Sequence, residues 1–232
     1  MSRPVALVTG ARGGVGRALI ERLTASGYDV IAHSRSPLTD DSVAVRHLSG
    51  DLSDPETAAA VAADAGAVDL LVNNAADQSV AALDDLSASD WMDMLGATFL
   101  SAVNLSSALR PAFAPGSCIV NISSIEARSA FPRHGHYAAA KAALESFTRT
   151  AALEWAPEGV RVNAVSPGLV DRPGLAQAWP EGWEWWQRTC PLGRPIHPGE
   201  VADAVVFLAS ASGVSGVVLP VDGGWSASAR RV

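Results

Sequence analysis

The sequence predicts an α/β fold in which a parallel sheet carries helices on both faces. Two observations support this prediction: short apolar runs of strand length recur along the chain, and several of them are separated by segments with apolar residues at helical spacing. Right-handed crossovers between such units build a doubly wound parallel sheet. The sequence has no internal repeat or interdomain linker, so residues 1–232 are predicted to form a single domain.

The predicted strands occupy residues 5–8, 29–32, 43–48, 69–72, 118–122, 160–165 and 217–221. Between the first two, Val15, Leu19 and Leu23 recur every four residues and predict an amphipathic helix. A second apolar stripe at helical spacing precedes the sixth strand and consists of Leu144, Phe147, Ala151 and Trp155. This stripe fits either an intramolecular core or a contact between subunits.

Residues 171–198 interrupt the alternation, because they hold five prolines and four tryptophans. We interpret this segment as a lid inserted over the edge of the sheet where α/β folds bind their ligands. Trp179, Trp183 and Trp186 can share one face of a short helix, which is typical of a packed lid or a subunit contact. Alternatively, these indoles line the substrate pocket, because rigid aromatic walls bind flat or apolar ligands well.

Composition argues against several classes of function. A formal net charge of -7 is unfavourable for a nucleic-acid partner, which draws on clustered Lys and Arg. Cys118 and Cys190 lack the spacing of a metal site, so we expect neither a disulfide framework nor a bound metal. The uncharged stretch 204–221 is interrupted by Ser, Gly and Pro and fits two short elements better than a membrane span. The first residues do not resemble a signal peptide, so a cytoplasmic location is expected.

A glycine-rich loop follows the first predicted strand. The pattern TGxxxGxG spans residues 9–16, which are Thr9, Gly10, Ala11, Arg12, Gly13, Gly14, Val15 and Gly16. Glycines let the backbone approach a pyrophosphate closely, and the N-terminus of the following helix offers unpaired N–H groups and a positive dipole end. An ordinary turn can carry the same letters, but their position between a strand and a helix predicts a dinucleotide site.

The end of the second predicted strand bears on the choice of cofactor. NAD-binding folds of this kind place a carboxylate there for the ribose 2′-hydroxyl, whereas this chain has His33, Ser34, Arg35 and Ser36. Arg35, with Arg12 from the glycine loop, can pair with a 2′-phosphate through charge-assisted hydrogen bonds, so we expect NADP(H). The alternative is that both arginines are solvated surface charges.

A tyrosine and a lysine provide the candidate acid/base chemistry. Lys141 is the single lysine among the 17 basic residues and follows Tyr137 by four positions, which places both side chains on one face of a helix. A phenol with an ordinary pKa of about 10 acts as a base only beside a cation that stabilises the phenolate, and Lys141 supplies one. Ser124 lies at the carboxyl end of the fifth predicted strand, where its hydroxyl can stabilise charge on a substrate oxygen. Serines at strand ends also form turns, but the Tyr137/Lys141 pair favours the catalytic interpretation.

With these motifs assembled, the chain resembles the short-chain dehydrogenase/reductase family over essentially its whole length. The matching segments are residues 9–16, Asp51-Leu52, Asn73-Asn74-Ala75-Ala76, Ser124/Tyr137/Lys141, Arg161-Val162-Asn163, Pro167-Gly168 and Val221-Asp222-Gly223-Gly224. The resemblance implies a Rossmann-type sheet of about seven strands in the order 3-2-1-4-5-6-7.

The resemblance also implies where the cofactor binds. Asp51 and Leu52 flank the adenine, and the Asn73-Asn74-Ala75-Ala76 segment borders the cofactor ribose. Tyr137 and Lys141 contact the nicotinamide half of the cofactor. The turn formed by Pro167, Gly168 and Val170 faces the same half.

Three positions depart from the family pattern. Thr98 stands where the family has an Asn whose backbone holds a water in a proton relay, and its hydroxyl can hold a water instead. Ala76 replaces the last glycine of an Asn-Asn-Ala-Gly motif. Arg172 replaces a threonine that touches the carboxamide.

These residues together predict an oxidoreductase (EC 1.1.1.-) that transfers hydride between NADP(H) and a small-molecule carbonyl or alcohol. We expect a ketoreductase for an apolar or aromatic substrate. One alternative is C=N reduction, as in pterin-type members of the family, although those enzymes carry an acidic residue where this chain has Ser124. Another is a non-catalytic NADP(H)-binding sensor, which Thr98 and Arg172 allow. The resemblance implies a homodimer or homotetramer.

Overall fold

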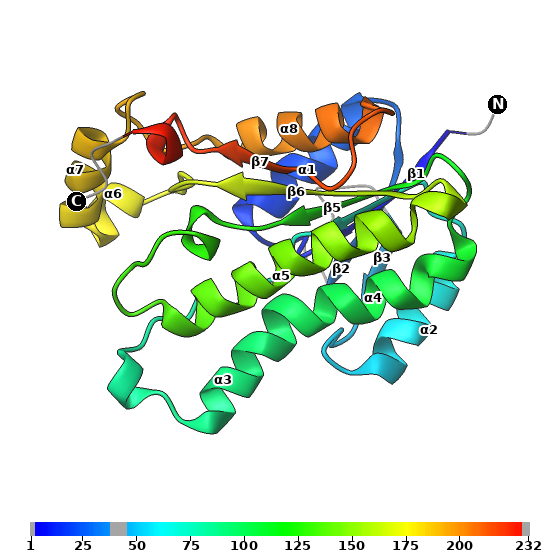
Figure 1. Ribbon diagram of the computed structural model, residues 1–232, viewed down its shortest axis with the longest axis horizontal. Helices are drawn as coiled ribbons and strands as arrows, with labels where there is room; N and C mark the ends of the chain where they lie inside the picture. The colour runs from blue at the N-terminus through cyan, green and yellow to red at the C-terminus, as the bar shows by residue number, and fades with distance from the viewer. Residues whose placement is uncertain (1–2, 38–45, 229–232) are drawn as a thin grey trace.

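The computed structural model describes residues 3–37 and 46–228, in which seven parallel strands form one sheet in the order β3-β2-β1-β4-β5-β6-β7 (Figure 1). The strands are β1 (Val5–Thr9), β2 (Asp29–Ser34), β3 (Arg46–Ser49), β4 (Leu70–Asn73), β5 (Cys118–Ile122), β6 (Arg161–Pro167) and β7 (Val218–Val221). The predicted sheet and its strand order are therefore confirmed. Residues 43–45 of the third predicted strand lie outside the described residues.

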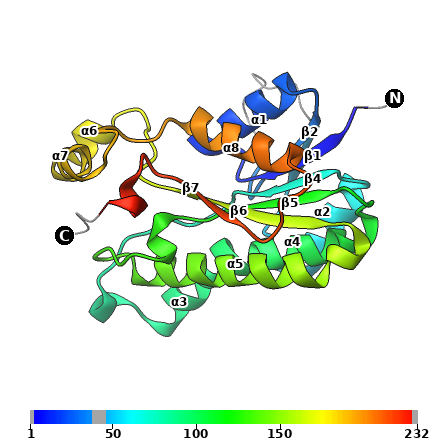
Figure 2. The ribbon, with the colours of Figure 1, turned by 45° about the horizontal axis from the view of Figure 1, so that its top comes forward.

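Helices cover both faces of the sheet (Figure 2). On one face lie α1 (Gly14–Ala25) and α8 (Pro198–Ser210), and on the other lie α2 (Pro55–Ala65), α4 (Ser101–Leu109) and α5 (Gly135–Glu154). Strand side chains alternate between the two layers: Ala6 and Val8 belong to the α1/α8 core, whereas Leu7 belongs to the opposite core. Both faces of β1 are thus buried, as parallel sheets require.

The second apolar stripe is part of the intramolecular core. Leu144, Ala151 and Trp155 are buried, and Phe147 packs edge-on against the Trp155 ring at 5.9 Å between centroids. Ala151 and Trp155 share a cluster with Leu105 of α4. The stripe therefore joins α5 to α4 and the sheet within one chain.

The helices differ in how their N-termini are capped. Asp54 accepts the backbone N–H of Thr57 at 3.0 Å and caps α2, Ser87 forms a capping box with Asp90 at the start of α3 (Ala88–Leu95), and His197 caps α8. In contrast, α1 begins after Gly13 without any side-chain cap. Its first backbone N–H groups therefore have no acceptor from a capping side chain.

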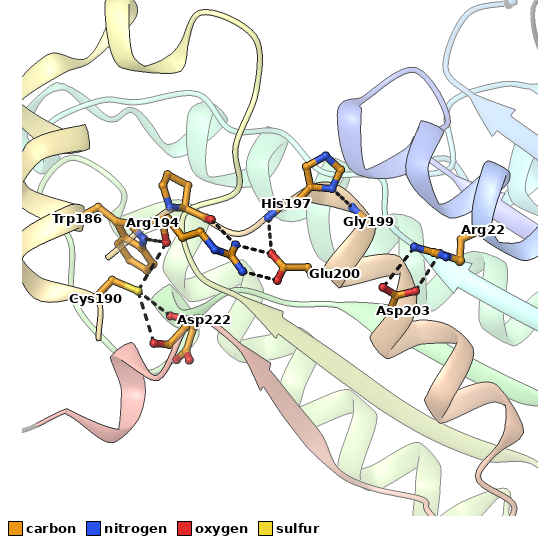
Figure 3. A network of polar contacts seen from close by, with 11 residues as sticks. Arg22, Trp186, Cys190, Arg194, His197, Gly199, Glu200, Asp203 and Asp222 are labelled. Carbon is orange, nitrogen blue, oxygen red and sulfur yellow. Dashed lines mark hydrogen bonds and ion pairs between the residues drawn. The ribbon is translucent and has the colours of Figure 1, made fainter. Parts of the chain in front are cut away.

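Residues 171–198, the lid segment, contain α6 (Leu175–Ala178) and α7 (Pro180–Thr189). Figure 3 shows how the end of the lid segment is fixed to the sheet and to α8. Arg194 makes two 2.8 Å contacts with Glu200, and the Trp186 indole N–H donates to the Arg194 carbonyl at 2.9 Å. The Cys190 thiol donates to the Asp222 carbonyl at 3.5 Å. These contacts attach the lid segment to both α8 and the end of β7.

The remaining elements are short. A π-helical turn, Gly96–Leu100, joins α3 to α4, and 3-10 turns occur at Leu83–Asp85, Arg110–Ala112, Ile125–Ala127, Ala156–Glu158 and Trp225–Ala227. The uncharged stretch 204–221 divides between α8 and β7, as predicted. No helix within the described residues is long and apolar enough to cross a membrane.

Candidate active site

The loop between β1 and α1 is tight enough to require glycine at two positions. Gly10 has φ +68°, and a Cβ added there would lie 2.8 Å from Asn74 Nδ2 and 2.9 Å from Ala75 Cα. A Cβ added at Gly16 would lie 2.2 Å from the Gly10 carbonyl oxygen. Side chains at these positions would displace the loop, because both obstacles include backbone atoms.

Hydrogen bonds tie this loop to the end of β4. The Thr9 hydroxyl accepts the backbone N–H groups of Asn74 at 2.9 Å and Ala75 at 3.0 Å. In return, the Asn74 amide donates to the carbonyls of Thr9 at 2.9 Å and Gly10 at 3.1 Å. The structure therefore brings Asn74 and Ala75 against the glycine loop, and Ala76 follows directly at the edge of the sheet.

The uncapped start of α1 fits the phosphates of a dinucleotide. Gly13, Gly14 and Val15 form its N-terminus, the first turn has no acidic residue, and the helix dipole places partial positive charge there. Backbone N–H groups at such a helix start are well suited to phosphate oxygens. The geometry matches the group that the glycine pattern predicts.

The residues predicted to hold the adenosine half lie at the ends of β2 and β3. The Ser34 hydroxyl donates to the Ser36 carbonyl at 2.6 Å and is 2.9 Å from His47 Nε2. Arg12 and Arg35 are both exposed. Hydrogen bonds from Ser53, aided by the charge of Arg35, lower the pKa of Asp51.

Leu52, beside Asp51, is buried, and a side chain from α4 holds this turn in place. The Asn104 amide donates to the carbonyls of Leu52 and Ser53, each at 3.1 Å. Sequence reasoning did not predict this contact.

Tyr137 and Ser124 meet at the carboxyl end of β5. Tyr137 is 6% exposed, and its phenol oxygen forms hydrogen bonds with the Ser124 hydroxyl and the Gln78 amide. Burial, followed by the charge of Glu126, raises the Tyr137 pKa above its ordinary value, and the two hydrogen bonds oppose this increase. The phenol is therefore protonated at neutral pH in this state.

Lys141 lies one helical turn further along α5, as its spacing from Tyr137 predicts. Its Nζ donates to the Ile122 carbonyl at 2.6 Å and lies 5.6 Å from the centre of the Tyr137 ring. Burial lowers the Lys141 pKa to about 7, because a low-dielectric surrounding disfavours the ammonium. The acid/base pair is thus assembled where β5 ends.

Thr98 lies in the π-helical turn between α3 and α4 and is fully buried. Its hydroxyl accepts the Asp77 backbone N–H at 3.1 Å and lies 3.4 Å from Met94 Sδ. The hydroxyl thus supports the segment after β4 that also carries Gln78. This contact is distinct from the water-holding role that we expected of Thr98.

An ionisable pair, not predicted from the sequence, lies beside the phenol. His134 Nδ1 is 2.8 Å from a Glu126 carboxylate oxygen, and the rings of His134 and Tyr137 are 5.7 Å apart. The hydrogen bond to Glu126 raises the His134 pKa. These residues come from either end of the loop that precedes α5, so no sequence spacing signals their contact.

A chain of buried amides supports β4 and β5 beneath the site. The Asn73 amide donates to Asn121 Oδ1 at 2.8 Å and to the Ser106 hydroxyl at 3.0 Å, and the Asn121 amide donates to the Thr148 hydroxyl at 2.9 Å. The available signal in the sequence was an asparagine at or near the carboxyl end of each of two otherwise apolar strands.

Comparison with known proteins places this arrangement in a family. A family model described as enoyl-(acyl carrier protein) reductase matches residues 10–226. An uncharacterized short-chain type dehydrogenase/reductase of Sinorhizobium fredii is 35% identical over 242 residues, which cover 95% of this chain and 43% of that protein. The chain belongs to the short-chain dehydrogenase/reductase family. Enzymes of this family use NAD(P)(H), and the chain is an oxidoreductase of alcohol or carbonyl groups.

Two other similar proteins match the chain almost from end to end. Cis-4-hydroxycyclohexanecarboxylate dehydrogenase of Sinomonas cyclohexanicum is 37% identical over 241 residues, with 96% of each chain covered. The crystal structure of a gluconate 5-dehydrogenase from Burkholderia cenocepacia, in complex with NADP and tartrate, has a TM-score of 0.87 at 28% identity and covers 98% of this chain and 97% of that chain.

In this short-chain dehydrogenase/reductase, the tryptophans of the lid segment are not gathered on one surface. Trp186 is 1% exposed and stacks on Trp225 with 6.1 Å between ring centroids. A Cβ added at Gly168 would lie 2.5 Å from the Trp186 ring, so Trp186 packs beneath the turn of Pro167, Gly168 and Val170. Trp186 therefore belongs to the core of the lid segment, as the packed-lid interpretation has it, and lines neither of the two cavities described below.

Two cavities adjoin the lid segment. One, of about 490 Å³, is lined by Trp179, Trp185 and Trp225 together with residues 128–132 of the loop between Ser124 and Tyr137. The other, of about 420 Å³, includes Trp183 and residues at the start of α8. Trp179 and Trp183 thus face different cavities, while Trp185 and Trp225 contribute rings that sequence reasoning missed. Within the described residues, no group of three or more His, Cys, Asp or Glu is arranged to hold a metal ion.

Proposed function

We propose that the chain is an NADP(H)-dependent carbonyl reductase in which Tyr137 donates the proton to the substrate oxygen. The observation that carries this proposal is the meeting of Ser124, Tyr137 and Lys141 at the carboxyl edge of the sheet, which also holds the glycine loop. Open α/β sheets bind their ligands at this edge. Oxidation of the corresponding alcohol follows the same path in reverse.

Carbonyl reduction in this site requires the cofactor and three side chains. The bound nicotinamide supplies the hydride. The Ser124 hydroxyl stabilises the charge that develops on the substrate oxygen. Tyr137, protonated at neutral pH, donates its proton to the same oxygen, and Lys141 in its charged form stabilises the resulting phenolate.

The residues that would hold the cofactor follow the edge of the sheet from the glycine loop. Residues 10–16 and the start of α1 bind the phosphates, and Asp51 and Leu52 contact the adenine. The nicotinamide half is surrounded by residues 73–76 and by the turn of Pro167, Gly168 and Val170. Arg12 and Arg35 are proposed to bind a 2′-phosphate, because Ser34 stands in place of a carboxylate. The similarity to an enzyme solved with NADP supports this choice.

The proposed substrate is an apolar or aromatic ketone. The 490 Å³ cavity supports this class, because three of its lining residues are tryptophans and Phe131 adds a fourth aromatic ring. Part of its wall, residues 128–132, belongs to the loop that connects Ser124 to Tyr137. In this proposal the lid segment carries two of the four rings and shapes the pocket.

We also propose a homodimer or homotetramer. Leu153 on α5 is 79% exposed and Phe207 on α8 is 54% exposed, and large apolar side chains at such levels mark candidate subunit contacts. Sedimentation equilibrium would show a mass above that of one chain.

The test of catalysis is Tyr137→Phe, assayed with NADPH and with NADH against aromatic ketones and a dihydropterin. We expect wild-type enzyme to favour NADPH and ketones, and the variant to lose at least about a hundredfold in kcat, the usual size of an acid/base contribution. Cofactor affinity should change little. Retained turnover would refute the role of Tyr137, preference for NADH would refute the cofactor choice, and cofactor binding without any turnover by wild-type enzyme would favour a sensor.

A further inference from the structure

The Glu126–His134 pair has solvent access that the two central groups of the site lack. The side chains of His134 and Glu126 are 25% and 16% exposed, whereas Tyr137 and Lys141 are 6% and 2% exposed. Glu126 lies 2.8 Å from His134 Nδ1, so Nε2 is the ring nitrogen that remains for a second partner. Within residues 3–37 and 46–228, no hydrogen bond engages this Nε2. Because the His134 ring also contacts the Tyr137 ring, it reaches from the buried phenol to solvent.

Tyr137 needs a source of protons, because donating one to the substrate leaves a phenolate. Its hydrogen-bonding partners Ser124 and Gln78 do not titrate near neutral pH. Lys141 is bonded to a carbonyl of β5 at 2.6 Å and stabilises the phenolate only while it keeps its own proton. The imidazole of His134 is therefore the titratable group that both contacts the phenol ring and reaches solvent.

Glu126 dominates the electrostatic surroundings of His134. The hydrogen bond to this carboxylate and its charge raise the His134 pKa above the ordinary 6.5, and partial burial opposes the increase. Tyr137 faces the imidazole from α5, and the neighbouring Arg133 is exposed. The turn Leu83–Asp85 packs on the start of α5 through its leucine, and both of its aspartates are exposed. The imidazolium therefore persists to higher pH than that of an isolated histidine.

We propose that His134 carries protons between solvent and Tyr137, and that Glu126 positions it for this task. Glu126 holds Nδ1–H, so Nε2 is the nitrogen that exchanges its proton. The 5.7 Å between the two ring centres is compatible with transfer directly or through one water. This inference rests on the proposed function, because it assumes that Tyr137 gives up a proton in each reduction.

The proton balance closes without a further reactant. After reduction, the Nε2–H bond of the imidazolium breaks, and the O–H bond of Tyr137 forms again. The neutral imidazole then takes a proton from water or a buffer acid, while Glu126 keeps its charge throughout. Alcohol oxidation runs these steps in reverse and releases one proton to solvent.

The experiment measures kcat for reduction of an aromatic ketone by His134→Gln, with the nicotinamide cofactor that wild-type protein prefers. Without the imidazole, kcat should fall by about tenfold to a hundredfold, near the lower end of the contribution of a positioned acid/base group. Added imidazole should restore much of the loss, because the removed ring leaves a partly exposed space. Tetramethylammonium at the same ionic strength should restore nothing, since it has no proton to give.

His197→Asn is the matched control. It removes an exposed imidazole at the start of α8, and Asn also caps helices well. Its kcat should equal that of wild-type protein and should not respond to imidazole.

Glu126→Gln tests the positioning role and keeps an acceptor for Nδ1–H. Because reduction requires the imidazolium, kcat should decline as the pH rises through the His134 pKa. Removing the carboxylate charge should lower this pKa, measured from the imidazole C–H signals in NMR spectra, and should move the decline in kcat to lower pH with it. This variant and wild-type protein decide the question even if His134→Gln does not fold.

The outcomes separate this inference from its rivals. Undiminished kcat in His134→Gln would overturn it, and so would a loss that imidazole does not restore, which would assign His134 to substrate binding or to structure. A lower His134 pKa in Glu126→Gln with an unmoved pH profile would show that another group supplies the proton. If wild-type protein reduced no ketone with either cofactor, the proposed function would fail and this inference with it.

Discussion

Burial shifts the pKa values of Tyr137 and Lys141, the two central residues of the site, in opposite directions. It raises the pKa of the Tyr137 phenol and lowers the pKa of the Lys141 ammonium, so both changes favour the neutral forms. Ser124 and Gln78 oppose this by hydrogen bonding to the phenol oxygen. In the ligand-free protein the phenol is therefore protonated and can act as an acid, whereas forming its phenolate requires Lys141 in its charged form.

The lowered pKa of Lys141 predicts how stability depends on pH. Its value is about 7 in the folded protein and 10.5 ordinarily, so between these limits the unfolded chain binds more protons and stability rises with pH. Below pH 7 the full cost of burying the ammonium is present. Relative to Lys141→Met, wild-type protein should gain stability from pH 7 to 9.5, by at most about 1.4 kcal/mol per pH unit.

Urea unfolding of the two ligand-free proteins at several pH values would measure this difference. The contributions of other titrating groups, including Cys118 with its raised pKa, cancel in the comparison because both proteins contain them. A constant difference between the proteins across this range would show that Lys141 keeps an ordinary pKa.

Single residues also show what the sequence can and cannot predict at a site. Tyr137 and Lys141 share a helix face and Ser124 ends a strand, so local spacing was enough to place them together. Gln78 and Glu126 reach Tyr137 from loops, and a loop position depends on tertiary packing that no local pattern encodes. The contact between Thr98 and the Asp77 backbone could not be predicted for the same reason, since Asp77 lies on another segment.

Among the elements, α1 differs from the other helices in having two glycines, Gly14 and Gly16, in its first turn. Its second and third turns pack on the core through Leu19 and Leu23, while its first turn contacts the glycine loop. The lid segment is the least predictable element. Trp179, Trp183 and Trp186 were expected on one helical face, but α7 begins only at Pro180, so Trp179 lies outside the regular helix.

Two glycines of α1 provide a matched pair of substitutions. Gly16→Ala places a Cβ 2.2 Å from the Gly10 carbonyl oxygen, and overpacking of this kind typically destabilises a protein by about 1–3 kcal/mol. Gly14→Ala meets nothing closer than 4.0 Å and gains helix propensity. Thermal unfolding should show a lower Tm for the first variant and an equal or higher Tm for the second. Equal losses in both would mean that the loop relaxes and that its fit is not specific.

At the scale of the whole molecule, the described residues contain one large core on each side of the sheet and smaller clusters, one of which lies under the lid segment. The predicted sheet with helices on both faces accounts for the large cores, because side chains alternate along each strand between the two layers. The smaller cluster joins Ile125, Trp186, Cys190 and Trp225, which lie far apart in the sequence. No periodicity connects them, so only the folded arrangement identifies this cluster.

Because the small cluster shares no residue with the two large cores, we expect it to open without global unfolding. Trp225→Ala removes the ring that stacks on Trp186 and should accelerate tryptic cleavage after Arg188 in α7 while leaving the main thermal transition nearly unchanged. Leu208→Ala, in the α1/α8 core, should instead lower the main transition, by about 2–5 kcal/mol in unfolding free energy, without selective cleavage there. If Trp225→Ala shifted the main transition as much as Leu208→Ala and cleavage stayed slow, the lid segment would unfold only with the rest of the protein.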